Sequence, residues 1–315
     1  MKIIDVHSHF IIPEYMQSLV SHHREMEDGF PAPTWSIEEH LAYMDMAGIE
    51  KSLISVSSPH FHSGDGAEAI ALGKLMDEQA AAYKRQSPDR IMLAAALPVP
   101  EIEASVDAVN YAYDVLGADA VKLPSNACGL YPGDARYEPL FKVLNEHKAV
   151  VILHPAAPAE VPQGCFTAGP LPLFEFIADT TRAVINLITS GTLERYPDIR
   201  VIVPHCGSFL PNIIDRLTGI TKVLASKGVG KPVEVKKSLQ SLYFDIAGDV
   251  LPAGIEILLT LTDENHLLFG GDFPYTPKEV VAGKVQALMQ QERLQPMLDK
   301  LMYKNAEILF DKKSC

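Results

Sequence analysis

Eight short apolar segments, separated by amphipathic stretches, constrain the fold of this chain more than any other feature of its sequence. Several are almost continuous runs of Val, Ile and Leu, which is typical of parallel strands buried on both faces. The predicted strands are residues 3–6, 52–57, 91–97, 120–123, 150–154, 200–205, 242–246 and 267–270. So regular an alternation of strands and helices predicts an α/β fold with a parallel sheet.

The segments between these strands carry helix signals. Ser36 and Glu39 form a capping box, and Gly48 is expected to end the helix that follows. Residues 103–116 place apolar side chains on one face at steps of three and four. The other predicted helices are residues 67–86, 137–147, 174–191, 210–227, 253–262, 278–290 and 296–310.

Eight strand–helix units predict a single (β/α)₈ TIM barrel that occupies residues 1–315 as one domain. The alternative is an open doubly wound sheet, but the Gly-rich phosphate-binding loop expected after its first strand is missing. Two long irregular stretches, residues 11–35 and 155–172, each follow a strand. In a barrel they would lie over the active-site face as lid-like insertions.

Charge and composition argue against two classes of partner. The net charge of −13 is opposite to the charge expected for binding nucleic acid or an anionic membrane surface. No stretch approaches the ~18 uninterrupted apolar residues that a membrane-spanning helix needs. The four cysteines show no CxxC spacing, and no secretory signal pattern opens the sequence, so we expect a cytoplasmic protein with reduced thiols.

Polar residues stand at the carboxyl ends of several predicted strands. His7 and His9 follow the first strand, and His154, His205 and Asp272 follow the fifth, sixth and eighth. In a barrel these ends meet at one mouth, and His7 and His9 point the same way because side chains alternate along a strand. Each residue alone could be structural, but together they predict a divalent-metal site.

Lys122, at the end of the fourth strand, allows two interpretations. It could be a cation for a substrate carboxylate or a structural ion pair, or it could be carboxylated and bridge two metals. Ser208 and Phe209 follow His205 closely and are predicted to line the substrate pocket. We expect His60 and His62 to form a substrate-loop or solvated pair, Arg182 to form a structural salt bridge, and Cys206 to fill the core.

Five motifs carry a resemblance to the amidohydrolase superfamily. The chain is most similar to the branch that includes 2-amino-3-carboxymuconate-6-semialdehyde decarboxylase and related 6-methylsalicylate-type aromatic acid decarboxylases. The motifs are Ile-Asp-Val-His-Ser-His, Val-Ile-Leu-His-Pro, Asp-Thr-Thr-Arg, Val-Ile-Val-Pro-His-Cys-Gly and Phe-Gly-Gly-Asp-Phe-Pro. Together they extend over nearly the whole chain.

The resemblance implies a role for each matching residue. His7, His9, His154 and Asp272 would bind one divalent metal ion, with zinc the usual ion and manganese found in some relatives. His205 would lie beside the metal as a catalytic acid or base, and Asp272 could also move protons. The resemblance favours one metal over two bridged by Lys122, and it implies a homodimer.

These residues suit a metal-dependent carboxy-lyase, which decarboxylates a small aromatic or muconate-like carboxylic acid without an oxidant. The alternative is a metal-dependent hydrolase of an amide or lactone, because hydrolysis needs the same parts. A metal-binding assembly or sensor subunit without catalysis is a third hypothesis, which would predict a damaged metal site.

Overall fold

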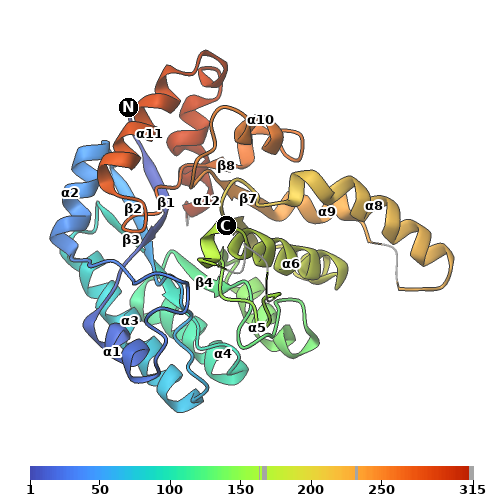
Figure 1. The fold of residues 1–315 in the computed structure, drawn as a ribbon, viewed down its shortest axis with the longest axis horizontal. Coiled ribbons are helices and arrows are strands. Elements are labelled where there is room, and N and C mark those ends of the chain that lie inside the picture. Colours follow the sequence, from blue (N-terminus) through green and yellow to red (C-terminus); the bar gives the residue numbers. More distant parts are fainter. Residues whose placement is uncertain (163, 165–168, 231–232, 312–315) are drawn as a thin grey trace.

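The structure, a computed structural model, describes residues 1–162, 164, 169–230 and 233–311. Eight parallel strands pair in sequence order, and helices surround them (Figure 1). The strands are β1 (Ile4–His9), β2 (Lys51–Ser55), β3 (Ile91–Ala96), β4 (Ala120–Pro124), β5 (Val150–His154), β6 (Arg200–Val203), β7 (Leu242–Asp245) and β8 (Leu267–Leu268). This arrangement confirms the predicted (β/α)₈ barrel.

Backbone hydrogen bonds join the last strand region to the first. Val6 N–H donates to the carbonyl of Phe269 over 3.0 Å, and Asp272 N–H donates to the carbonyl of His7 over 2.7 Å. His9 N–H donates to the carbonyl of Phe273 over 2.7 Å. The closure of the barrel therefore places Asp272 directly beside the two histidines of β1.

The capping signals define the helix before β2 as predicted. In α2 (Ile37–Ala47) the Ser36 side chain accepts a hydrogen bond from Glu39 N–H, and Gly48 ends the helix in the left-handed conformation. The other main helices are α1 (Pro13–Ser21), α3 (Gly66–Gln86), α4 (Ile102–Tyr111), α5 (Glu138–Glu146), α6 (Glu175–Thr189), α7 (Thr192–Arg195), α8 (Leu210–Ser226), α9 (Val235–Ser238), α10 (Gly254–Leu258), α11 (Lys278–Gln290) and α12 (Asn305–Phe310).

Two apolar clusters stabilise the barrel. Val6, Leu53, Ala94 and Ile152 belong to the smaller cluster, which comes mainly from the strands. The larger cluster joins the strands to the surrounding helices.

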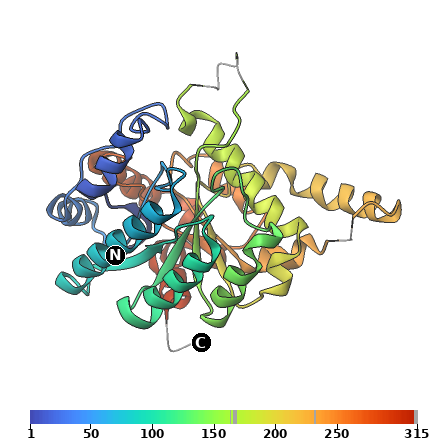
Figure 2. The same ribbon diagram turned by 90° about the horizontal axis from the view of Figure 1, so that it is seen from below.

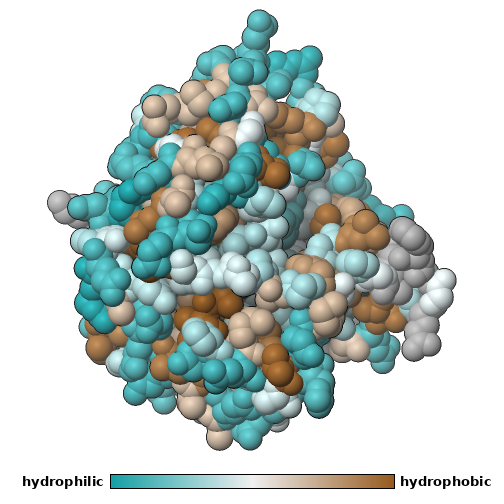
Figure 3. All heavy atoms as spheres, turned by 60° about the vertical axis from the view of Figure 1, so that its left-hand side comes forward, coloured by the Kyte–Doolittle hydropathy of each residue, from teal (hydrophilic) through white to brown (hydrophobic). Residues whose placement is uncertain are grey.

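On the face shown in Figure 3, apolar side chains form scattered groups among hydrophilic ones. No helix in the described part of the chain has both the length and the apolar character needed to cross a bilayer.

Several predicted boundaries differ from the structure, and those nearest the site matter most. The sixth strand ends at Val203, before His205, and the eighth is only two residues long. The stretch 11–35 is not irregular throughout, because it contains α1, which begins at Pro13. Residues 163 and 165–168 of the second insertion lie outside the described residues.

Helix α8 extends beyond the rest of the barrel, as Figures 1 and 2 both show. Its buried residues, Leu210 and Ile214, lie in its first half. Ile220, Val223 and Leu224 follow at steps of three and one and are all exposed. The far half of this helix therefore presents an apolar stripe to solvent.

Candidate metal centre and substrate cavity

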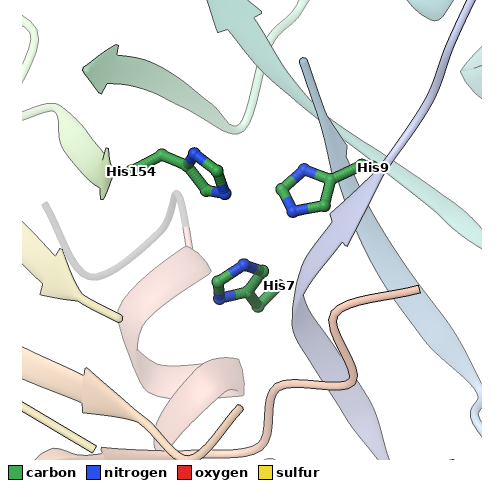
Figure 4. Close-up of side chains that lie close together, drawn as sticks. All are labelled: His7, His9 and His154. Carbon is green, nitrogen blue, oxygen red and sulfur yellow. The ribbon is translucent and has the colours of Figure 1, made fainter. Parts of the chain in front are cut away.

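Three histidine rings from two strands face one another at the mouth of the barrel. His7 and His9 come from β1 and His154 comes from the end of β5 (Figure 4). The ring centroids lie 5.0 Å apart for His7 and His9, 4.7 Å for His9 and His154, and 5.4 Å for His7 and His154. All three side chains are buried, and they offer ligand atoms close enough to share one ion.

The hydrogen bonds of the Nδ1 atoms leave the Nε2 atoms free for a metal. His7 Nδ1 lies 2.9 Å from the Asp245 carboxylate, and His154 Nδ1 lies 3.0 Å from the carbonyl of Pro155. Because both partners can only accept, each Nδ1 carries a proton, and Nε2 is the ring atom that remains available to a metal. Among the described residues, His7 Nε2 and His9 Nε2 have no hydrogen-bond partner although both are buried, which is costly unless a ligand occupies the space they face.

Asp272 adds a carboxylate to the same point. One of its oxygens lies 3.3 Å from His9 Nε2 and 3.5 Å from His7 Nε2. Burial opposes ionisation, but the neighbouring His9 and His7 rings outweigh it and lower the pKa of Asp272 to about 2. Asp272 has a φ of 60°, so the backbone turns at this residue to bring its side chain to the histidines.

The charge states of the three histidines also suit the binding of a metal ion. Burial lowers the pKa of His9 to about 4 and that of His154 well below its ordinary value, which keeps both rings in the neutral, ligating form. At His7 burial is outweighed by the Asp245 carboxylate, which raises the pKa to about 9. The surroundings of His7 therefore favour positive charge, which a metal ion at Nε2 would supply. The residues present fit a divalent metal ion.

Asp245, at the end of β7, is a functional residue that the sequence analysis missed. Besides holding His7 Nδ1, its carboxylate accepts hydrogen bonds from the backbone N–H groups of His205 and Ala247, over 3.1 and 3.0 Å. It is completely buried. The rule that located the other ligands, a polar residue at a strand end, could have found it.

Asp5 holds the backbone at His7 and Gly271 in place. Its carboxylate accepts hydrogen bonds from the N–H groups of His7 and Gly271, over 3.0 and 2.9 Å, and from the Tyr43 hydroxyl over 2.7 Å. This carboxylate ties β1 and α2 to the segment after β8. It lies in a quoted motif, but its position before the strand end gave no signal of this role.

His205 and Cys206 lie beyond β6, which ends at Val203, and not on the strand itself. Both residues have a φ of 55°. His205 Nδ1 is buried and has no hydrogen-bond partner in the part of the chain that the structure describes, and its ring centroid lies 5.2 Å from that of His7. Cys206 packs against the core and also lines the cavity, and burial raises its pKa to about 12.

A cavity of about 580 Å³ opens beside the metal centre. His154, His205 and Asp272 line it on the metal side. Its other walls are largely apolar and aromatic, with few polar groups, which is typical of a site for a small organic molecule. They include Phe30, Pro170, Pro172, Phe176, Ile177, Val250 and Tyr275.

The residues predicted to bind substrate lie outside the lining of this cavity. Lys122 is buried, with Nζ 3.3 Å from the carbonyl of Ser57, which does line it. Burial lowers the pKa of Lys122 to about 7. The Ser208 hydroxyl lies 3.4 Å from the carbonyl of Pro204, and the Phe209 ring packs against Phe174. Their substrate-binding role stays a prediction.

The remaining predicted pairs have structural partners. His60 and His62 are buried and not solvated, and their Nε2 atoms lie near the Val99 carbonyl and Glu101 respectively. Arg182 forms the expected salt bridge, 3.4 Å from Asp179.

Comparison with known proteins identifies relatives of this chain. A 6-methylsalicylic acid decarboxylase of Penicillium expansum is 30% identical over 289 residues, which cover 89% of this chain and 87% of the relative. This finding confirms the resemblance to aromatic acid decarboxylases.

Solved structures share the fold. A crystal structure described as amidohydrolase II superimposes with a TM-score of 0.92 at 35% identity, covering 98% of this chain and 99% of that one. A 5-carboxyvanillate decarboxylase of Novosphingobium aromaticivorans, solved with manganese and a nitrobenzoic acid, gives a TM-score of 0.89 at 22% identity over 98% and 95%. An amidohydrolase family model matches residues 4–312, so the chain belongs to the amidohydrolase family.

Proposed function

We propose that this protein is a metal-dependent decarboxylase of small aromatic carboxylic acids. The observation that carries the proposal is the group of His7, His9 and His154, with the Asp272 carboxylate 3.3–3.5 Å from two of their rings, beside an apolar cavity. The relative from Penicillium expansum is named for the decarboxylation of such an acid, 6-methylsalicylic acid.

One divalent ion would be held by His7, His9, His154 and Asp272. We propose zinc, which suits a site of three imidazoles and one carboxylate, although the compared decarboxylase structure holds manganese. The ion would supply positive charge that stabilises an anionic substrate oxygen. We propose one ion rather than two bridged by a carboxylated Lys122.

The chain's own residues would deliver the proton. Decarboxylation breaks the bond between the ring carbon and the carboxylate, releases CO₂ and forms a C–H bond at the same carbon. His205 and Asp272 both face the cavity beside the metal centre. Either could carry a proton to that carbon, and the apolar walls would limit the access of water to the reacting carbon.

Product analysis tests this function. Metal-loaded protein is incubated with a panel of hydroxybenzoic acids, and CO₂ and phenols are quantified. We expect equal amounts of CO₂ and the matching phenol from at least one acid. If no acid on the panel releases CO₂, while an amide or lactone is cleaved with incorporation of oxygen from ¹⁸O-labelled water, the protein is a hydrolase.

The assembly and location follow as part of the same proposal. A homodimer would cover the exposed apolar stripe of Ile220, Val223 and Leu224 on α8. Light scattering of the purified protein should then give twice the 34.5 kDa of one chain.

A cytoplasmic location is supported by Cys128 and Cys206, which are free thiols.

A further inference from the structure

The cavity contains a carboxyl group that the proposed reaction does not use. Asp28, from the segment between β1 and α2, lines the cavity and is only 3% exposed. Two other carboxylates line it: Asp272 belongs to the metal centre, and Asp249 has a side chain that is 94% exposed and pairs with Lys284. Asp28 is therefore a buried carboxyl group without an assigned role.

The position of Asp28 is fixed by contacts on both sides. Its Oδ1 accepts a hydrogen bond from the Ser58 hydroxyl over 3.0 Å. Its backbone carbonyl accepts one from Leu171 N–H over 2.9 Å, and Gly29 packs closely against Pro170. The segments after β1 and β5 therefore hold Asp28 in place at the wall of the cavity.

Tyr275 contacts both a predicted metal ligand and the residue that holds Asp28. Tyr275 packs against His9 with ring centroids 5.5 Å apart, and its hydroxyl donates to the carbonyl of Ser58 over 3.0 Å. Ser58 in turn holds Asp28. On its other side Tyr275 packs against Phe30, with centroids 6.0 Å apart. Asp28 is thus connected to His9 through Ser58 and Tyr275, and it lines the same cavity as Asp272.

The side chain of Asp28 has capacity for a ligand. In the described part of the chain, the Ser58 hydroxyl is its one hydrogen-bond partner, and a carboxyl group can accept several bonds. Burial raises the pKa of Asp28 to about 7. A divalent ion in the proposed metal site would attract the carboxylate of a substrate, which leaves Asp28 to face another part of its ring.

Building on the proposed function, we propose that Asp28 is a specificity-determining residue that binds a hydrogen-bond donor on the substrate ring, remote from the carboxylate. The preferred substrates are hydroxybenzoic acids with a hydroxyl group on the far side of the ring. Ser58 orients the carboxyl group of Asp28 for this contact. The pair forms a polar subsite in a largely apolar cavity.

Substrates that differ in one group test the inference. The metal-loaded wild type is compared with Asp28→Ala on 2,4-dihydroxybenzoic acid and 2-hydroxy-4-methylbenzoic acid, which have similar shapes. We expect the wild type to prefer the hydroxyl compound by about tenfold or more in kcat/KM, because the methyl compound leaves the buried carboxyl group of Asp28 without a hydrogen-bond partner. In Asp28→Ala this preference should disappear.

Two further variants keep the test informative. Asp28→Asn keeps the size of the side chain and should fold even if Asp28→Ala does not, and it should reduce the preference without removing it. Glu14→Gln removes an exposed carboxylate from α1 and should leave the preference unchanged. An unchanged preference in both Asp28 variants would overturn the inference.

A binding measurement separates this inference from the proposed reaction. Calorimetry compares resorcinol with 3-methylphenol, the products expected from the two acids, on metal-loaded protein. Tighter binding of resorcinol that depends on Asp28 supports the subsite even if neither acid is decarboxylated. Decarboxylation of both acids, with equal binding of both phenols to the wild type, would leave the reaction standing and refute the subsite.

Discussion

At the scale of single residues, the proposed metal site gives different roles to His154 and His205. His154 offers Nε2 to the metal, so His154→Ala removes one ligand of four, and the purified variant should contain much less metal than the wild type. Elemental analysis by mass spectrometry measures this. His22→Ala is the matched control, since His22 pairs with Glu68 near the surface. Full metal content in His154→Ala would refute its role as a ligand.

His205→Ala should have the opposite effect. The variant should retain its metal but lose about 10² to 10⁴-fold in kcat, the usual contribution of a general acid or base. Metal analysis and turnover are measured on the same preparation. A metal-free variant would show that His205 is a ligand.

Asp245 acts on the metal through His7. Asp245→Asn weakens the acceptor of His7 Nδ1, so the affinity for the metal should fall by about 10 to 100-fold. Competition with a chelator measures the affinity. Asp249→Asn changes an exposed carboxylate four residues later and should leave the affinity unaltered. Equal affinities in the two variants would contradict the role of Asp245.

His40 should make stability depend on pH. Trp35 Nε1 donates to its Nδ1, and burial lowers its pKa to about 3. The unfolded chain, with an ordinary histidine pKa near 6.5, binds the proton first, so the contribution of His40 is complete above pH 6.5 and is lost as the pH falls toward 3. Between pH 6 and 5 the free energy of unfolding should fall by up to about 1.4 kcal/mol more in the wild type than in His40→Gln. Denaturant unfolding measures it, and identical slopes would contradict the assignment.

At the scale of elements, the closure of the barrel depends on Gly271. A Cβ atom there would lie 2.0 Å from the Tyr43 hydroxyl oxygen, so Gly271→Ala should lower the free energy of unfolding by about 1–3 kcal/mol. Gly283→Ala in α11 meets nothing within 4 Å and should be neutral or stabilising by about 0.5–1 kcal/mol. Chemical denaturation of both variants checks the difference. Equal stabilities would show that the segment after β8 adapts freely.

Local sequence signals predict where the strands and α2 lie but not where every strand ends. Apolar runs located all eight strands, and the Ser36 capping box located α2, because both signals are local. The ends of β6 and β8 were not predictable from apolar character, since His205 and Asp272 take left-handed backbone conformations imposed by the surrounding structure. Asp28 lies in an insertion where no periodic pattern marks it, and only the folded structure brings it to the cavity.

At the scale of the whole molecule, the proposed function requires residues from distant parts of the chain to meet around one ion. β1 and β5 supply the histidines, and the segment after β8 supplies Asp272. The most direct test is a crystal structure of the zinc- or manganese-loaded protein with anomalous diffraction at the metal edge. We expect one peak per chain, bonded to His7 Nε2, His9 Nε2, His154 Nε2 and an Asp272 oxygen. A peak elsewhere, or a second peak at Lys122, would contradict the account.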